Sequence, residues 1–244
     1  MAQVVKKTND LIEKYTKSRN IAIIGFIVCG ISFILFGVCA MTFTFALSPV
    51  CMIGFLGGGG VGGFFSQKAS ALHSGIAGEE TTADIIRSLP DYYCGFQNVR
   101  VAYDGKMSEI DMVVVGPTGV FIIETKNMNG TVVGNFDNPQ WTQRKIGQQG
   151  TPYSRNFYNP IKQVRTHVYR LANYIRSNGV NVHIESMVYF SNPDTAIQLV
   201  GTPSDTPVFS ALANSSYDIC AYITNRPQIL GGEQIRRIVN LLNV

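Results

Sequence analysis

Two acids and a lysine in the middle of the chain have the types and spacing to do hydrolytic chemistry. In a strand over 120–126, side chains alternate between faces, so Glu124 and Lys126 share one face. Asp111 begins the preceding apolar run, 111–115. If the two runs are antiparallel neighbours, the start of one lies beside the end of the other, and Asp111 meets Glu124 and Lys126.

A cluster of this kind has a definite chemical use. Two neighbouring carboxylates form a hard-oxygen site for Mg²⁺ or Mn²⁺ and leave coordination positions to water and phosphate. A lysine beside the metal can hold the attacking water and offset the charge that develops on phosphate. The alternative is that Glu124 and Lys126 form a solvated pair on an edge strand.

Further segments stand in a fixed order around these three residues. They are Gly75–Glu79, Glu109–Pro117, Gly119–Asn127, Gly130, Trp141 and Asn159–Gln163. The ordered set resembles the nuclease-related domain family (NERD), which has the core of the PD-(D/E)xK nucleases. A lone ExK would carry little information, but the ordered set spans roughly residues 75–176, which is most of the soluble domain. The usual proline before the first acid is Ile110 here, so the literal motif is degenerate.

The resemblance implies a role for each matched position. Asp111 and Glu124 match the metal-binding acids, and Lys126 matches the catalytic lysine. Glu79 matches the acid of the first core helix, which lies beside the metal. Gln163 matches the glutamine of a later helix that touches substrate or water; the alternative is an exposed helix residue.

Other side chains have weaker functional interpretations. Glu80 competes with its neighbour for the role of the helix acid. Trp141 could stack on a base, but a core aromatic is the expected role. His167 and Arg170 could contact phosphate, although a solvated helix face is expected. The candidates for a phosphate-facing, nucleic-acid-binding rim are Arg144, Lys145, Arg155 and Lys162.

The elements that must position these residues form an α/β pattern. Asn159-Pro160 is typical of a helix cap followed by a first helical residue, and Asp104-Gly105 is typical of a hairpin turn. The expected fold is a restriction-endonuclease-like core, with a mixed β-sheet flanked by helices, preceded by a transmembrane helical hairpin. The expected helices are 78–89, 160–178 and one after Gly232; the expected strands are 98–103, 108–115, 120–126, 131–133, 184–190 and 218–224.

Residues 20–67 contain no Asp, Glu, Lys or Arg. A spanning helix needs about 20 apolar residues, so the stretch predicts two transmembrane helices, near 21–42 and 47–65, with Pro49 in the turn region. A cleaved signal peptide is the alternative, but its apolar core would be only about 7–15 residues. The expected organisation is a basic arm over 1–19, two transmembrane helices over 20–67 and a nuclease-like domain over 70–244.

Basic residues flank this uncharged stretch and are absent from its turn. Arg19 precedes it and Lys68 follows it, which predicts that both ends lie in the cytoplasm of a bacterial cell. The protein would then be a multi-pass protein of the inner (cytoplasmic) membrane, with its N-terminus and nuclease domain in the cytoplasm. The glycine run over 57–63 indicates close helix packing or a homo-oligomer, with a pore or hinge as the alternative. The arm is expected to be a helix, either on the inner leaflet or solvated.

These observations predict a membrane-anchored endonuclease that depends on Mg²⁺ or Mn²⁺ and hydrolyses DNA phosphodiesters. DNA is favoured over RNA by the resemblance only, and the lipid bilayer is the second expected partner. A role in defence or in processing foreign DNA would suit a tethered nuclease. The alternatives are a catalytically inactive nucleic-acid-binding or membrane scaffold module on a nuclease fold, and a membrane protein whose hairpin does the work.

Overall fold

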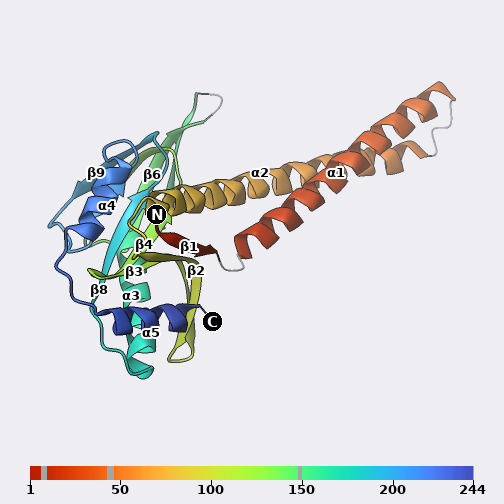
Figure 1. Cartoon of the computed structure of the whole chain (residues 1–244). Helices are drawn as coiled ribbons and strands as arrows, with labels where there is room; N and C mark the ends of the chain where they lie inside the picture. The colour runs from red at the N-terminus through yellow and green to blue at the C-terminus, as the bar shows by residue number, and fades with distance from the viewer. Residues whose placement is uncertain (7–9, 43–46, 148–149, 244) are drawn as a thin grey trace. The chain divides into compact units, whose positions relative to one another are not determined.

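The computed structural model describes residues 1–6, 10–42, 47–147 and 150–243 and divides into two compact units (Figure 1). One unit comprises residues 9–76. The other comprises residues 1–8 together with 77–244. Helix α2 runs without a break from Ser48 to Arg87, so the boundary between the units falls inside a continuous helix.

The unit formed by residues 9–76 is a hairpin of helices α1 (Asp10–Met41) and α2 (Ser48–Arg87). Large apolar side chains such as Ile24 and Phe33 are exposed along it, whereas the buried positions of α1 are small: Ser18, Ala22, Gly25, Ser32 and Cys39. Both helices are long and apolar enough to cross a membrane.

Glycines bring the two helices of the hairpin into backbone contact. A Cβ atom added at Gly58 would lie 2.7 Å from the carbonyl oxygen of Gly25, and one added at Gly25 would lie 2.7 Å from the amide nitrogen of Gly62. Atoms do not approach so closely, so these positions require glycine. Gly57 and Gly60, by contrast, have no such neighbour within 4 Å. The interpretation of the glycine run as a packing surface is therefore confirmed at Gly58 and Gly62.

Both helices extend beyond the expected spans. α1 begins at Asp10 rather than near residue 21, and the helix expected over 78–89 is the last part of α2. No proline occurs between Pro49 and Pro90, and the residues between the two expected helices include the good helix formers Ala69, Ala71 and Leu72, so the helix continues.

The expected helical arm is helical only from Asp10 onward, where α1 begins; its first part is a strand. β1 (Gln3–Lys6) pairs in parallel with β2 (Cys94–Tyr103), with Gln3 opposite Cys94 and Lys6 opposite Gln97. Val4 packs against the core cluster on one side of the sheet and Val5 against the cluster on the other. This alternation is that of a strand covered on both faces, and it overrides the rough helical spacing.

The main sheet of the second unit is mixed, as expected. Its order among the described residues is β1-β2-β3-β4-β8-β10, with antiparallel pairing from β2 to β4 and parallel pairing elsewhere. Asp104 and Gly105 both have positive φ, which confirms the tight hairpin between β2 and β3. The remaining bounds are β3 Lys106–Gly116, β4 Gly119–Lys126, β8 Ile184–Phe190 and β10 Val208–Ser210.

Helices cover both faces of this sheet, which confirms the α/β fold class. The end of α2 and helix α4 (Ser216–Thr224) pack on one face, and helices α3 (Pro160–Ser177) and α5 (Gly232–Leu242) pack on the other. The strand expected over 218–224 is wrong. The Asp218 carboxylate accepts a hydrogen bond from the backbone amide of Ser215, which starts a helix, and Ile219 and Ile223 share its buried face.

A second sheet, in the order β7-β6-β5-β9, is interleaved with the main one along the chain: β5 to β7 lie between β4 and β8, and β9 lies between β8 and β10. Trp141 is buried in it and donates from its indole nitrogen to the carbonyl oxygen of Asn135 at 2.9 Å. This confirms Trp141 as a core aromatic. The strand bounds are β5 Gly130–Asn135, β6 Gln140–Ile146, β7 Pro152–Tyr158 and β9 Thr195–Val200.

Candidate active site

Strands β3 and β4 separate at Asp111. Their ladder runs from Gly116 opposite Gly119 to Met112 opposite Ile123 and goes no further. Beyond it, the Asp111 carboxylate accepts a hydrogen bond from the backbone amide of Thr125 at 2.8 Å. A side chain thus satisfies a backbone donor that the neighbouring strand no longer reaches. We call this point the fork.

The ladder on the other side of β3 is also interrupted at the fork. Gln97 pairs with Met112 and Val99 pairs with Ile110, but Asn98, which lies between them, does not pair with Asp111. Asn98 is buried and has φ +55°, a left-handed conformation that asparagine tolerates better than most residues. Asp111 therefore has no paired residue in either neighbouring strand, β2 or β4.

Glu124 and Lys126 lie on the other branch of the fork and share one face of β4. There β4 pairs with β8, with Glu124 opposite Val188 and Lys126 opposite Phe190. Glu124 is 1% exposed, and the Lys126 ammonium donates to its Oε1 atom at 2.6 Å. The interpretation as a solvated edge pair is wrong, since β4 is an interior strand and Glu124 is buried.

Helix α3 closes the fork with two side chains, Gln163 and His167. Asn159 caps the helix, because its side chain accepts a hydrogen bond from the amide of Ile161. Gln163 follows in the first turn, and its Oε1 accepts a hydrogen bond from Lys126 at 3.1 Å. Gln163 is therefore part of the cluster and not simply an exposed helix residue.

The expectation that His167 lies on a solvated helix face is wrong. It is buried, with its Nε2 atom 3.4 Å from Oε2 of Glu124. Among the described residues, that oxygen and both ring nitrogens of His167 make no hydrogen bond. Its place one turn after Gln163, between the apolar positions Val164 and Leu171, is the sequence signal that could have revealed it.

Electrostatics at the fork distinguish the two central acids. Burial raises the pKa of Asp111 well above its ordinary value, and the charges of Glu124 and Glu79 raise it further. Burial also acts to raise the pKa of Glu124, but Lys126 and His167 outweigh it and lower that pKa. For Lys126, burial acts to lower the pKa, and the two carboxylates outweigh it and raise it. The fork thus brings the three carboxyl groups of Asp111, Glu124 and Glu79 near one lysine.

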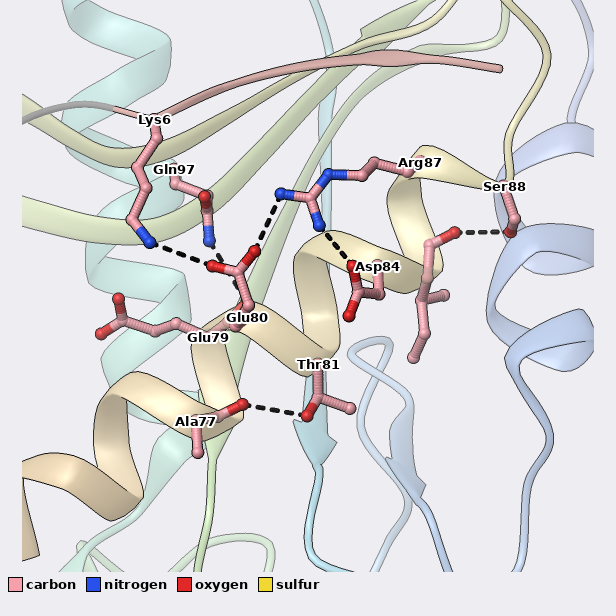
Figure 2. Close-up of polar contacts among 10 residues, drawn as sticks. Lys6, Ala77, Glu79, Glu80, Thr81, Asp84, Arg87, Ser88 and Gln97 are labelled. Atoms are coloured by element: carbon pink, nitrogen blue, oxygen red, sulfur yellow. Dashed lines mark hydrogen bonds and ion pairs between the residues drawn. The ribbon is translucent and has the colours of Figure 1, made fainter.

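Figure 2 shows that the two candidate acids on α2, Glu79 and Glu80, point in different directions. Glu80 is held by ion pairs with Lys6 at 3.0 Å and Arg87 at 2.9 Å, and hydrogen bonds from these two residues lower its pKa. Glu79 points away from this group, is buried, and lies close enough to Asp111 to raise its pKa. Glu79, and not Glu80, is the helix acid at the fork.

The four basic residues expected at a phosphate-facing rim lie on three different elements. Arg144 and Lys145 belong to β6 and Arg155 to β7, whereas Lys162 precedes Gln163 on α3. Within the described ranges, none of the four forms an ion pair with a carboxylate. Arg170, by contrast, is tied to β3 through the Ser108 hydroxyl and the Met107 carbonyl.

The chemistry of the cluster is that of oxygen ligands beside a fixed cation. In the part of the chain that the structure describes, no three His, Cys, Asp or Glu side chains are arranged to hold a metal ion by themselves. Asp111 and Glu124 could supply two ligands, with water or a phosphate oxygen completing the coordination, as Mg²⁺ sites commonly do. Both carboxylates are anchored, one by a backbone amide and the other by a lysine.

Comparison with known proteins agrees with this geometry. Residues 74–191 match the nuclease-related domain (NERD), and this range contains the fork and Gln163. An uncharacterized protein of Bacillus anthracis is 36% identical over 95 residues, which cover 37% of this chain and 44% of the relative. The match therefore spans less than half the length of that curated relative, and no solved structure matches the chain. Residues 74–191 of this chain belong to the nuclease-related domain family.

Proposed function

We propose that this protein is a membrane-anchored endonuclease that depends on a divalent metal and hydrolyses DNA phosphodiesters. The observation that carries the proposal is the fork, where Asp111, Glu124 and Lys126 meet inside a nuclease-related domain. The choice of DNA rests on the family resemblance.

The residues at the fork fit Mg²⁺ or Mn²⁺. The Oε2 atom of Glu124 is buried without a hydrogen bond, and burial, together with the charges of Glu124 and Glu79, raises the pKa of Asp111. Asp111 and Glu124 would hold the ion, with Glu79 nearby. When bound, such an ion supplies a water of lowered pKa and neutralises charge on the phosphate.

The chain's own residues would position the reactants. The Lys126 ammonium, fixed by Glu124 and Gln163, would orient the attacking water and stabilise the extra negative charge that develops on the phosphate oxygens. The water oxygen forms a bond to phosphorus as the bond from phosphorus to the leaving sugar oxygen breaks. The water loses a proton to solvent, and the leaving oxygen takes one up.

The hairpin would anchor this domain in the cytoplasmic membrane, with the nuclease on the cytoplasmic side. Support comes from two helices of sufficient length and apolarity, and from the basic residues that flank them. A nuclease held at the inner face of the membrane would meet DNA as it enters the cell, so we propose a role against phage or plasmid DNA. Deletion of the gene should then raise the frequency of phage infection or plasmid uptake.

The test uses the purified full chain in detergent, with plasmid DNA, linear DNA and RNA of the same sequence. Cleavage should require Mg²⁺ or Mn²⁺, stop in EDTA, and be lost in Asp111→Ala and Lys126→Ala. Asp91→Ala and Lys106→Ala, which change exposed residues outside the fork, should cleave normally. Cleavage that survives both fork substitutions would refute the proposed site.

A second candidate is a non-catalytic nucleic-acid-binding module. It is favoured by the finding that no three potential ligand side chains among the described residues are arranged as a metal site. On this view the folded wild-type chain would bind DNA without cutting it, and Lys126→Ala would leave both DNA binding and the effect on phage unchanged.

A further inference from the structure

A cavity of about 420 Å³ lies between the two helices of the hairpin, inside the unit formed by residues 9–76. Its polar lining comes from both helices: Tyr15 and Arg19 of α1, and Ser66, Ser70 and His73 of α2. Ile23 and Phe26 continue the lining along α1 into the uncharged stretch. The cavity therefore has a polar part with one permanent cation and an apolar part.

The cavity sits where the uncharged stretch ends. Arg19 is the last charged residue before it, and Lys68 is the first one after it. Because α1 and α2 form a hairpin, these two residues mark the same end of the helix pair. In a membrane-spanning hairpin, this level is that of the lipid headgroups.

The guanidinium of Arg19 is positioned by aromatic side chains and is available to bind an anion. Its guanidinium lies 5.5 Å from the centre of the Tyr15 ring, and the His73 ring packs on Tyr15 at 5.6 Å. Within the described residues Arg19 forms no ion pair with a carboxylate, so its charge is available. Ser66 and Ser70 are one helical turn apart on α2, and both hydroxyls line the same cavity.

We infer that this cavity binds the phosphate headgroup of an anionic phospholipid, with the acyl chains lying along Ile23 and Phe26. A guanidinium with nearby hydroxyls matches phosphate oxygens, and the adjoining apolar wall matches a lipid but not a free phosphate ion. The inference rests on the proposed membrane anchoring of the hairpin.

The experiment measures lipid retention by the full chain. The protein is reconstituted in phosphatidylcholine bilayers with or without phosphatidylglycerol, and the lipids that stay bound on release are counted by native mass spectrometry. The wild type should retain phosphatidylglycerol in preference to phosphatidylcholine. Arg19→Gln should weaken that retention about tenfold, as expected for the loss of one charge-assisted hydrogen bond, and Arg19→Lys should restore much of it.

The matched control is Lys17→Gln, which removes an equal charge from an exposed position that does not line the cavity. Equal losses in Lys17→Gln and Arg19→Gln would mean that general surface charge attracts the lipid, and would overturn the site. Displacement of phosphatidylglycerol by millimolar inorganic phosphate would also overturn it, since the cavity would then be a site for free phosphate.

Failure of this inference can be told apart from failure of the anchor. Sedimentation with phosphatidylcholine vesicles tests the anchor, and Arg19→Gln should sediment like the wild type. If the wild type stays in the supernatant, the anchor proposal fails and this inference fails with it. If both proteins sediment but retain phosphatidylglycerol equally, only the lipid site fails.

Discussion

At the fork, the Glu124 carboxylate meets a different nitrogen at each oxygen, with Lys126 at Oε1 and His167 at Oε2. Lys126 fixes one oxygen by a hydrogen bond, and the buried imidazole lies 3.4 Å from the other without a hydrogen bond, which confines the plane of the carboxylate. A ligand oxygen that is oriented in this way before the reaction needs no rearrangement when substrate arrives. His167 therefore acts on the site through Glu124, as a positioning residue.

His167→Ala should raise the Mg²⁺ concentration needed for half-maximal cleavage. Residues that orient metal ligands typically change metal affinity or activity by about 10–100-fold, and we expect a rise in this range. The measurement is the rate of plasmid cleavage as a function of Mg²⁺ concentration. His167→Gln, which keeps an N–H donor at a similar reach, should recover part of the loss.

The control for this prediction is His183→Ala, a histidine that the structure places outside the fork. It should leave the Mg²⁺ dependence unchanged. If His167→Ala lowers thermal stability but leaves the Mg²⁺ dependence at the wild-type value, then His167 is a packing residue and its orienting role is refuted.

Asn98 makes a second prediction at this scale. Because its φ is +55°, Asn98→Ala should destabilise the nuclease domain by about 1 kcal/mol, while Asn98→Gly should cost less. Unfolding can be followed through the fluorescence of Trp141, the only tryptophan, which is buried. If the two variants are equally stable, the left-handed backbone conformation of Asn98 does not limit the stability of the domain, and the prediction is refuted.

Among the elements, the sequence predicted best those with a strong local signal. These are β4, a short apolar run between turn residues, and α3, a capped amphipathic helix. β1 was missed because its pairing with β2 is long-range in sequence. α4 was mistaken for a strand because its short run is rich in apolar residues, whose periodicity is ambiguous over so few positions.

The contact between α1 and α2 gives a prediction with an internal control. Gly58→Leu should weaken the hairpin, because its side chain would overlap the backbone of Gly25, whereas Gly57→Leu, with open space around it, should not. Both variants improve intrinsic helix propensity equally, so their difference isolates packing. Circular dichroism of the full chain against increasing SDS measures it. Equal transitions in both variants would contradict the helix contact.

At the scale of the whole molecule, the sequence could predict the acids of the site but not all that surrounds them. Strand alternation brought Asp111, Glu124 and Lys126 together, and the family resemblance added Glu79 and Gln163. Asn98 was beyond sequence reasoning, since its importance depends on how β2 meets the fork, and His167 left only the weak signal of its place one turn after Gln163. The second sheet was predicted only at its first strand, because its other strands are short and largely polar.

The flanking charges predict on which side of the membrane the chain's ends lie. Reporter enzymes that work only in the cytoplasm should be active when fused at either terminus, because basic residues precede α1 and follow the apolar part of α2. Reporters that work only outside the cytoplasm should be inactive at both positions. An active external reporter at both termini would reverse the proposed orientation.

The pairing of β1 with β2 also constrains how the chain between them can be placed relative to a membrane, and this constraint does not depend on charge. β1 precedes the hairpin in the chain and β2 follows it, yet the two are hydrogen-bonded neighbours in one sheet. A chain that leaves a compartment between these strands must return to it before the sheet can close. If the hairpin is the membrane anchor proposed above, the number of bilayer crossings between Lys6 and Cys94 must therefore be even, so α1 and α2 would cross together and neither could cross alone.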